Sequence, residues 1–367
     1  MIGGGQAGLA LGYFLSQQGR DFTILEAAAD PGAAWRQRWD SLKLFTSARY
    51  NALPGLPFPG DPDRYPSRDE VVDYLADYAR RFELPVELDS RVRLLSKPNG
   101  AYLVALDDRS YAADQVVVAT GPFQVPFVPA LAERLDERVL QLHSSDYRSA
   151  GGVSNGPVLV AGGGNSGFQL AEELSRAHEV HIAIGSRQTP LPQRLLGRDL
   201  FWWLDLSGLL RTSVESRIGR RLSGRETLIG PRPRTQARRH GLRLRGRAVD
   251  ATGSTVRFDD GSRLDVGSVI WATGFRSDYS WIHVPVFDER GRLLHRRGVT
   301  ASPGLYFLGL TWQHTRGSAL LGFVKDDAEH IAQQIAAFQP AAADHRDRSP
   351  AHHKDVAAAS ARSAPRE

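Results

Sequence analysis

The chain has 367 residues, of which 41% are hydrophobic and 24% are charged, and its formal net charge is +5. These values are typical of a globular protein of two or three domains. Because the chain contains no cysteine, a disulfide framework is excluded, and so is a flavin disulfide reductase, whose chemistry needs a redox pair of thiols. No run of 18 apolar residues occurs, so we expect neither a transmembrane helix nor stable insertion into a membrane.

The first feature along the chain is a glycine-rich turn of the form G-x-G-x-x-G. In a strand–turn–helix unit, the first glycine makes the tight turn, the second lets the backbone approach a pyrophosphate, and the third lets helix and strand pack closely. An apolar-faced helix is predicted over 7–18, and a strand over 22–25 ends in an acidic residue suited to a ribose hydroxyl. A solvated charge at the strand end is the alternative for that acid. The predicted dinucleotide site comprises Gly3, Gly5, Gln6, Ala7, Gly8 and Glu26.

The strand before this turn is unusually short. Only Met1 and Ile2 precede Gly3, whereas a strand usually has about five or six residues. We therefore expect the natural chain to begin several residues upstream of Met1.

A second turn of the same form follows, 159 residues from Gly3 to Gly162, between a predicted strand over 158–161 and a predicted helix over 166–176. The next strand, over 180–184, ends in Gly-Ser-Arg with no acid. The lost acid and the gained arginine suit a ribose 2′-phosphate, so NADPH is favoured and NADH is the alternative. An ordinary surface arginine is the other interpretation. The second site comprises Gly162, Gly164, Asn165, Ser166, Gly167, Ser186 and Arg187.

The chain also repeats itself on a larger scale. Alternating segments with turn signals run over 91–121 and again over 247–274, and each closes on an Ala-Thr-Gly strand end. This duplication favours an α/β fold with two Rossmann-like dinucleotide-binding domains. The strand ends add Thr120, Gly121, Thr273 and Gly274 to the candidate cofactor-binding residues.

Other stretches are marked by their composition. Between Arg211 and Arg247 there are twelve arginines and two glutamates. No nucleic-acid-binding motif accompanies them, so we expect no nucleic acid, and a solvated insert or a surface that steers NADPH fits better. Residues 201–204 are expected to form a buried helix. Residues 339–367 lack periodicity and are expected to be a disordered tail.

Four further stretches carry a resemblance to a known family. They lie over 30–59, 143–147, 198–204 and 312–322 and include Trp35-Arg36, Leu44-Phe45-Thr46 and Trp312-Gln313-His314-Thr315-Arg316-Gly317. Together with the two turns, they resemble the flavin-containing monooxygenase superfamily, in particular its bacterial flavoprotein branch associated with cation transport or efflux. The resemblance covers about residues 1–338.

The resemblance implies two cofactors and a domain order. FAD would occupy the first turn and NAD(P)H the second. An NAD(P)H-binding domain over 153–274 would be inserted between two parts of the FAD-binding domain, 1–152 and 275–338. The oxygen donor would be a C4a-hydroperoxyflavin.

The same resemblance implies roles for individual residues. Trp35, Arg36 and Thr46 would border the isoalloxazine ring, and Leu320-Leu321 would open the last helix, whose N-terminus faces the flavin. The candidate catalytic residues are Thr46, Gln313 and His314, the last two on the substrate side. No metal-ligand spacing appears in the sequence, so no metal site is expected.

Departures from the family pattern leave the reaction open. Of the signature F-x-G-x-x-x-H-x-x-x-[FYW], only His143 and Tyr147 remain, and Thr46-Ser47 stands where the eukaryotic-type enzymes have an asparagine. We expect a FAD- and NAD(P)H-dependent monooxygenase that transfers one oxygen atom to a sulfur or nitrogen atom of a small molecule. The alternatives are an NAD(P)H oxidase or reductase without oxygen insertion, and a non-catalytic flavoprotein that regulates a cation transporter.

The expected partners follow from this reaction. They are a small-molecule substrate and O2, and a homodimer is left open. Because no signal-peptide or lipidation motif appears in the sequence, we expect a cytoplasmic protein.

Overall fold

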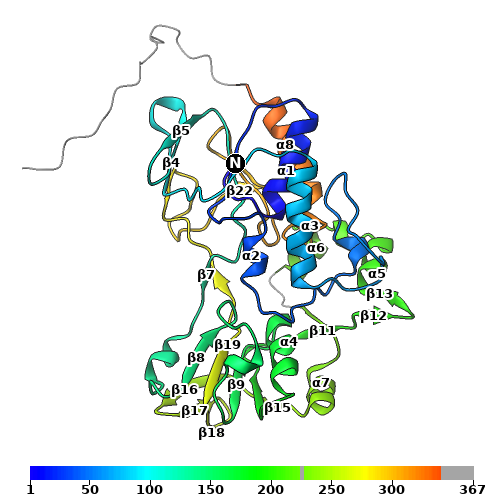
Figure 1. Ribbon diagram of the computed structural model, residues 1–367, viewed down its shortest axis with the longest axis vertical. Helices are drawn as coiled ribbons and strands as arrows, with labels where there is room; N and C mark the ends of the chain where they lie inside the picture. The colour runs from blue at the N-terminus through cyan, green and yellow to red at the C-terminus, as the bar shows by residue number, and fades with distance from the viewer. Residues whose placement is uncertain (224–226, 340–367) are drawn as a thin grey trace, which may run out of the picture.

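The computed structural model describes residues 1–223 and 227–339, which form two lobes stacked along the long axis of the molecule (Figure 1). The expected disordered tail lies outside the described residues, except for Gln339. Among the described helices, none has both the length and the apolar composition needed to span a membrane.

The first lobe is built around one sheet. Its parallel strands lie in the order β2 (Val86–Glu87), β1 (Ile24–Leu25), the single residue Ile2, β6 (Val116–Val118) and β24 (Leu305–Phe307). Two antiparallel strands continue it, β23 (Val299–Thr300) and β22 (His295–Arg296). Ile2 thus takes the place of a whole central strand, and its N–H donates to the carbonyl oxygen of Val117 at 2.8 Å.

Layers of different kinds cover the two faces of this sheet. Helices α1 (Gln6–Gln17) and α8 (Val324–Ala337) pack on one face, with α3 (Arg68–Arg81) against α1. The other face packs against a smaller sheet of β3 (Leu94–Ser96), β4 (Tyr102–Ala105), β5 (Ser110–Ala113) and β21 (Ile282–His283). Because side chains alternate along a strand, Val117 is buried among the helices while Val116 and Val118 are buried among the strands.

The second lobe repeats this plan. Its sheet is entirely parallel, in the order β15 (Arg243–Arg245), β10 (Val180–Ala183), β9 (Val158–Ala161), β19 (Ser268–Trp271) and β8 (Leu140–His143). Helices α4 (Asn165–Leu174) and α7 (Pro233–His240) accompany it, and an antiparallel sheet of β16 (Ala248–Thr252), β17 (Thr255–Phe258) and β18 (Arg263–Asp265) shares a core with its other face. The two Rossmann-like units predicted from the duplication are confirmed.

A narrow ribbon joins the lobes. The chain passes from the first lobe to the second at β7 (Val125–Pro126) and returns at β20 (Phe275–Arg276), and these two strands pair antiparallel (Figure 1). The second lobe is therefore inserted into the first. Strand β8 pairs with β19, so the second sheet takes in residues that the expected boundary at 152 assigns to the first domain.

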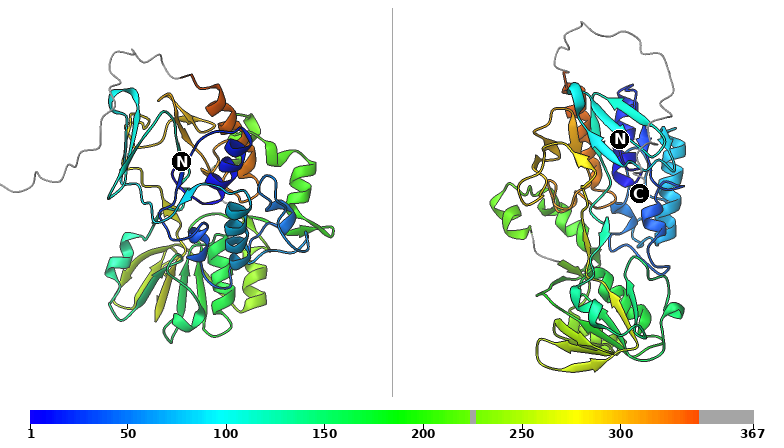
Figure 2. Two further views of the ribbon diagram at one scale, coloured as in Figure 1. Left: turned by 45° about the horizontal axis from the view of Figure 1, so that its top comes forward. Right: turned by 90° about the vertical axis from the view of Figure 1, so that its left-hand side faces the viewer.

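A third body of chain, the insert segment (residues 187–223 and 227–230), reaches back from the second lobe to the first. It contains β11 (Thr189–Leu191) paired with β14 (Thr227–Ile229), the hairpin of β12 (Arg194–Leu195) and β13 (Arg198–Asp199), and the helices α5 (Leu200–Leu206) and α6 (Arg217–Leu222). Figure 2 shows the two helices beside the first lobe. The helix expected over 201–204 lies within α5, but of these four residues only Phe201 is buried, and the other three are partly exposed.

Aromatic packing fixes the insert segment in place. The ring of Phe201 is completely buried, 6.0 Å from the ring of Phe45, 6.1 Å from that of Tyr50 and 5.7 Å from that of Phe323. All three partners belong to the first lobe. The lobes are therefore connected by a packed apolar cluster as well as by the ribbon.

We expect Phe201→Ala to destabilise the protein by about 3 kcal/mol, the usual cost of a phenylalanine-sized cavity. The measurement is the thermal midpoint by calorimetry. The matched control is Leu206→Ala on the same helix, where the side chain is 68% exposed and a small effect is expected. Equal shifts for the two variants would contradict the docking of α5.

Candidate functional site

The first glycine-rich turn is shaped by two close contacts and one open position. Gly3 has a φ of +110°, and a Cβ there would lie 2.6 Å from the carbonyl oxygen of Ala119. A Cβ on Gly8 would overlap the carbonyl oxygen of Gly3, whereas one on Gly5 would meet no atom of the described chain within 4 Å. Gly3 and Gly8 are therefore required by packing, and Gly5 leaves space at the start of α1.

The second turn repeats this construction. Gly162 has a φ of +127°, and Cβ atoms on Gly162 and Gly167 would overlap the carbonyl oxygens of Ala272 and Gly162. Gly164, like Gly5, faces open space. No side chain of the described residues caps α1 or α4, so both helices offer free N–H groups and the positive end of a dipole to an anion.

The Ala-Thr-Gly strand ends lie directly over the two turns. Ala119 and Ala272 make the close contacts with the glycines, so Thr120-Gly121 and Thr273-Gly274 leave each sheet at its turn. The hydroxyl of Thr120 accepts from Nε2 of Gln124 at 2.9 Å, and the hydroxyl of Thr273 donates to the carbonyl oxygen of Phe127.

The strand ends beside the turns differ in charge. In the first lobe, the carboxylate of Glu26 accepts from the N–H of Gly4 at 2.6 Å and from that of Ala28 at 3.0 Å. The first glycine of each turn donates to the last strand residue, Leu25 or Ala183, so the residue equivalent to Glu26 is the apolar Ile184.

Beyond Ile184, the second strand end carries arginine in place of an acid. Ser186 and Arg187 are exposed, and Nε of Arg247 donates to the carbonyl oxygen of Gly185 at 3.1 Å. Arg247 could not be assigned to this strand end from the sequence, because it lies 62 residues away on another strand end. One turn is thus accompanied by a carboxylate and the other by guanidinium groups.

The first residues of α1 and α4 each bind a neighbouring segment of the chain. Gln6 donates from Nε2 to the carbonyl oxygen of Ala319 at 3.1 Å and accepts from Nε1 of Trp35 at 2.9 Å. Trp35 lies on the short helix α2 (Ala33–Arg36), and Ala319 directly precedes Leu320-Leu321. Trp35 and the Leu320 segment therefore both meet the start of α1.

Asn165 plays the same part in the second lobe. Its Nδ2 donates to the carbonyl oxygen of Thr227 at 3.1 Å, and its Oδ1 accepts from the N–H of Ile229 at 2.8 Å. The side-chain amide holds strand β14 against the turn. Ser166, next along the chain, is exposed in the first turn of α4, and Ala7 is buried in the first turn of α1.

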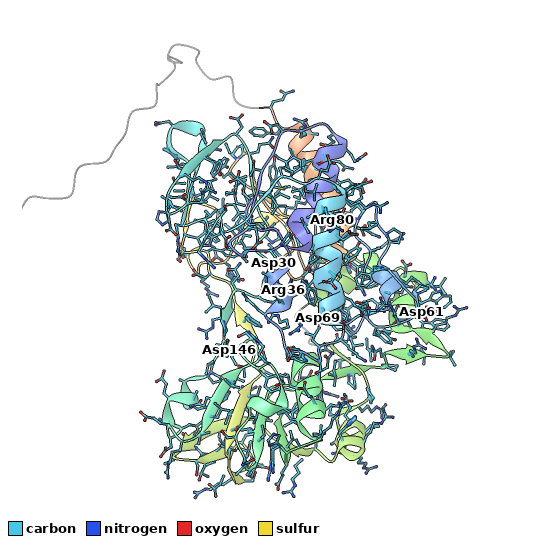
Figure 3. The ribbon with its side chains drawn as sticks, in the orientation of Figure 1. Asp30, Arg36, Asp61, Asp69, Arg80 and Asp146 are labelled. Carbon is cyan, nitrogen blue, oxygen red and sulfur yellow. The ribbon has the colours of Figure 1, made fainter. Side chains whose placement is uncertain are left out.

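Thr46 and Arg36 are each committed to a protein partner. Thr46 is buried, and its hydroxyl donates to Oδ1 of Asn51 at 2.6 Å, while Nδ2 of Asn51 donates back to the carbonyl oxygens of Thr46 and Ser47. The buried hydroxyl of Ser47 has no hydrogen-bond partner in the described chain. Arg36 on α2 pairs with Asp30 at 3.1 Å and is exposed (Figure 3).

Gln313 and His314 lie in the middle of the loop 309–319, away from its two ends. The two ends of this loop reach the start of α1, because Gly309 packs against Ala7 and Ala319 is bonded to Gln6. Between those ends, buried Gln313 lies against Gly298, and its Nε2 is unpaired within the described residues. His314 lies in a pocket beside β22.

Helix α4 contacts the first lobe at the segment that precedes Thr46. Nε2 of Gln169 on α4 donates to the carbonyl oxygen of Lys43 at 3.0 Å, and the hydroxyl of Ser41 donates to Glu173. Tyr147 donates to the same carboxylate at 2.9 Å, and burial, together with this contact, raises the pKa of the tyrosine. Helix α4 is therefore anchored to the chain segment that leads to Thr46.

His143 and Arg38 lie at the ribbon between the lobes. The ring nitrogens of His143 contact the hydroxyl of Ser145 at 2.8 Å and the carbonyl oxygen of Gly274 at 3.0 Å, and burial lowers the pKa of the imidazole. The guanidinium of Arg38 lies 4.8 Å from the ring centre of Phe275. Burial, followed by the charge of Arg148, lowers its pKa. Arg38 was not among the predicted site residues, although it lies within a stretch that carried the resemblance.

Metal ligation is the remaining chemistry to consider. Within residues 1–223 and 227–339, no group of three or more His, Cys, Asp or Glu side chains could hold a metal ion. The chemical features of the site are therefore its two glycine-rich turns, the different charges beside them, and the buried Thr46 segment whose preceding residues contact α4.

Comparison with known proteins identifies the family. Residues 1–195 match the family model described as pyridine nucleotide-disulphide oxidoreductase. A CzcO-like oxidoreductase of Geobacillus kaustophilus is 44% identical over 91% of this chain and 97% of its own length, and the CzcO oxidoreductase of Bacillus subtilis is 39% identical over 91% and 98%. A solved flavin-containing monooxygenase from Stenotrophomonas maltophilia is 30% identical, with a TM-score of 0.76 over 92% of this chain and 97% of that one. The chain is therefore an oxidoreductase that belongs to the pyridine nucleotide-disulphide oxidoreductase family, in its flavin monooxygenase-like branch.

Proposed function

We propose that the protein is a monooxygenase dependent on FAD and NADPH, with a small molecule and O2 as its substrates. NADPH, a proton and O2 would be consumed; one oxygen atom would pass to a sulfur or nitrogen atom of the substrate, and the other would leave as water. The observation that carries this proposal is the pair of identically built turns on one chain, with α4 hydrogen-bonded to the segment that leads to Thr46.

The first turn fits FAD. Gly5 leaves room for a pyrophosphate at the uncapped start of α1, and the carboxylate of Glu26 stands where a ribose hydroxyl needs an acceptor. The unpaired, buried hydroxyl of Ser47 offers a further hydrogen bond near the ring. Residues assigned to FAD are Gly3, Gly5, Gln6, Ala7, Gly8, Glu26, Trp35, Arg36, Thr46, Thr120, Gly121, Leu320 and Leu321.

The second turn fits NADPH better than NADH. Ile184 removes the acid that would repel a 2′-phosphate, and Arg187 and Arg247 supply guanidinium groups at the same strand end. The remaining residues assigned to NADPH are Gly162, Gly164, Asn165, Ser166, Gly167, Ser186, Thr273 and Gly274. When bound, FAD would accept a hydride from the nicotinamide and react with O2.

The protein's own contribution is placement and the exclusion of water. The Thr46–Asn51 hydrogen bonds hold a buried segment in place, and we propose that this segment forms part of the dry, fixed wall that a reactive oxygen donor requires. The chain has no cysteine, so it cannot use its own residues for the thiol exchange that gives its family the name. Catalytic roles for Gln313 and His314 would require the loop 309–319 to rearrange.

One observation favours a second candidate, an NAD(P)H oxidase without oxygen insertion. The hydroxyl of Thr46 is committed to Asn51, so it offers the bound flavin no free donor. A less protected oxygen adduct would release peroxide before a substrate could react.

Product stoichiometry separates these functions. We expect the FAD-loaded protein to oxidise NADPH and to form one sulfoxide per NADPH with methyl phenyl sulfide, while its peroxide yield falls as the sulfide is added. The measurement combines NADPH absorbance, an oxygen electrode and a peroxide assay. One peroxide per NADPH at every sulfide or amine concentration would establish the oxidase, and no NADPH oxidation would leave a regulatory flavoprotein.

Two glycine substitutions test the FAD turn. We expect Gly5→Ala to keep the melting temperature of the flavin-free protein and to weaken FAD binding at least about tenfold, because the added methyl group enters only the open space. Gly8→Ala should destabilise even the flavin-free protein, since its Cβ overlaps a backbone oxygen. FAD titration by fluorescence and thermal denaturation provide the measurements. Unchanged FAD affinity in Gly5→Ala would contradict this placement of the pyrophosphate.

Charge removal tests the preference for NADPH. We expect Arg187→Ala and Arg247→Ala each to raise the KM for NADPH about tenfold, the size expected for loss of a charge-assisted hydrogen bond. The KM for NADH, which lacks the 2′-phosphate, is the internal control and should change little. Equal changes for both nucleotides would show that these arginines do not recognise the phosphate.

A further inference from the structure

A large pocket lies beside the first lobe, and its lining residues include none from either glycine-rich turn. Its volume is about 720 Å³, within the usual range for sites that bind small molecules. Its walls come from β22, from the loop 309–319, from α8 and from the insert segment, represented by Arg296, His314, His330 and Glu215. The first lobe and the insert segment therefore build it together.

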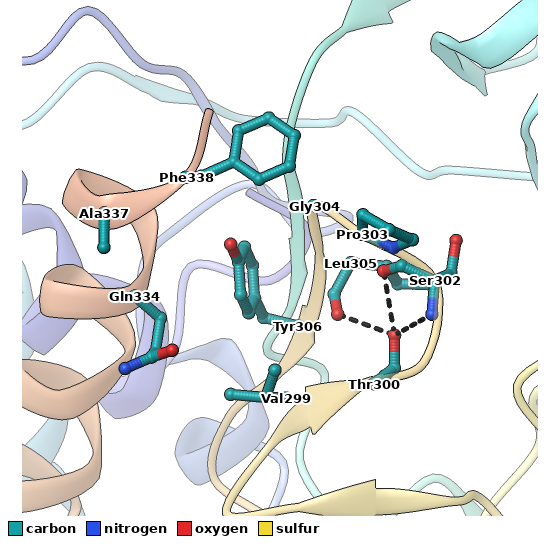
Figure 4. A pocket seen from close by; sticks show the side chains of 10 residues that line it. All are labelled: Val299, Thr300, Ser302, Pro303, Gly304, Leu305, Tyr306, Gln334, Ala337 and Phe338. Carbon is teal, nitrogen blue, oxygen red and sulfur yellow. Dashed lines mark hydrogen bonds between the residues drawn. The ribbon is translucent and has the colours of Figure 1, made fainter. Parts of the chain in front are cut away.

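A smaller pocket of about 210 Å³ adjoins it (Figure 4). The two share Val299, Thr300 and Gln334 as lining residues. The smaller one is bordered by the aromatic rings of Tyr306 and Phe338, and Figure 4 shows both rings beside the end of α8. The hydroxyl of Thr300 is occupied by the backbone of residues 302 and 305, so it adds little polarity. The two pockets therefore share a wall, and the smaller one adds two aromatic rings that the larger one lacks.

Two arginines of the larger pocket differ in how firmly they are held. Arg296 pairs with Glu215 at 3.0 Å, but the two side chains are 83% and 54% exposed, and an exposed ion pair contributes little. Arg297 pairs with the buried carboxylate of Asp327 through Nε at 2.9 Å and donates from Nη2 to the carbonyl oxygen of Asp326. Arg296 can therefore exchange its partner at little cost, and Arg297 is fixed in place.

Three histidines complete the larger pocket. Burial lowers the pKa of His295, His314 and His330, and the charge of Arg297 adds to this effect for the last two. Neutral imidazoles donate through one N–H each. His295 accepts from the N–H of Gly298 through Nδ1, which puts its own proton on Nε2. The larger pocket therefore offers several hydrogen-bond donors to an acceptor group of a ligand. It also offers the positive charge of Arg296, which can exchange Glu215 for a ligand.

We propose that this double pocket binds a small organic carboxylate with an apolar or aromatic tail, its carboxylate among Arg296, Arg297 and the histidines and its tail against Tyr306 and Phe338. A carboxylate matches the planar donors of a guanidinium. The rings of Tyr306 and Phe338 in the adjoining pocket favour a molecule with an apolar tail over an inorganic anion.

This site is distinct from the two dinucleotide turns but connected to one of them. The loop 309–319 contributes His314 to the pocket, while its ends contact Ala7 and Gln6 at the start of α1. On the opposite wall, the backbone N–H of Val214 donates to the carbonyl oxygen of His314 at 2.8 Å. A carboxylate that displaces Glu215 from Arg296 acts on the contact between the insert segment and this loop. The loop 309–319 therefore connects this site to the turn proposed to bind FAD, and the site itself is not part of that turn.

The affinity for the carboxylate rises as the pH falls. Burial lowers the pKa of the three imidazoles and so favours their neutral form. A bound anion favours their protonated form, so binding takes up protons. The fixed charges facing them are those of Arg296, Arg297, Glu215 and Asp327. Between pH 8 and pH 6, affinity should increase severalfold and calorimetry should register proton uptake.

Calorimetric titration of the FAD-loaded, full-length protein with phenylacetate tests the proposal. Phenylacetate should bind at least about tenfold more tightly than phenylacetamide, its uncharged counterpart, and more tightly than acetate, which lacks the tail. Equal affinity for acid and amide would overturn the proposal, as would failure of phenylacetate to bind or tighter binding of inorganic phosphate.

Two substitutions with opposite expected signs locate the site. Arg296→Gln should weaken phenylacetate binding about fivefold or more, whereas Glu215→Gln should strengthen it, because the competing carboxylate is gone. If the Arg296–Glu215 ion pair only stabilised the fold, both variants would lose it and would change binding in the same direction. Arg290→Gln, an exposed arginine outside the pocket, is the matched control and should bind like the parent. Weakening in both pocket variants, or equal behaviour of Arg296→Gln and Arg290→Gln, would overturn the assignment.

Discussion

The structure depends on a steric constraint that occurs twice. A backbone carbonyl of an Ala-Thr-Gly strand end lies where the first glycine of each turn would otherwise carry a side chain, and a second carbonyl occupies the same kind of space at the last glycine. These contacts bring a strand, a turn and a helix closer than any larger residue allows. The positions of α1 and α4, and the open space at their starts, follow from this close approach.

The second determinant is the way in which the two lobes are held together. A ribbon of two short strands would by itself permit wide movement. The burial of Phe201 against first-lobe aromatic rings, and the hydrogen bonds between α4 and residues 41–43, restrict that movement. The turns are therefore held at a defined separation, and the insert segment connects the two lobes through the packing of Phe201. Hydride transfer between two nucleotides requires such fixed placement.

The sequence was sufficient for the features that depend on local sterics. The glycine turns, the duplicated plan and the acid present at one strand end but absent from the other follow from residues close together in the chain. Other features depend on contacts between distant residues. Asn165 and Gln6 are proposed to contact the cofactors, and their amides also hold β14 and the Leu320 segment, which no local pattern indicates. Arg247 approaches Gly185 only because β15 and β10 are neighbours. The pairing of β8 with β19 and the direction in which Gln313 and His314 face were equally beyond a local pattern.

The insertion of one lobe into the other also determines the order in which the chain can fold. Every strand of the second parallel sheet lies between β7 and β20, so that sheet is a contiguous stretch of chain and can form as soon as it has been synthesised. The first sheet cannot, because β6 needs β24 beside it and β24 comes near the end of the chain. Until then, the apolar surfaces of β6 and α1 lack their partners β24 and α8. During translation the first lobe is thus the slower unit to form, with its pairing delayed by a long loop closure, and its exposed half is the part most in need of protection from aggregation.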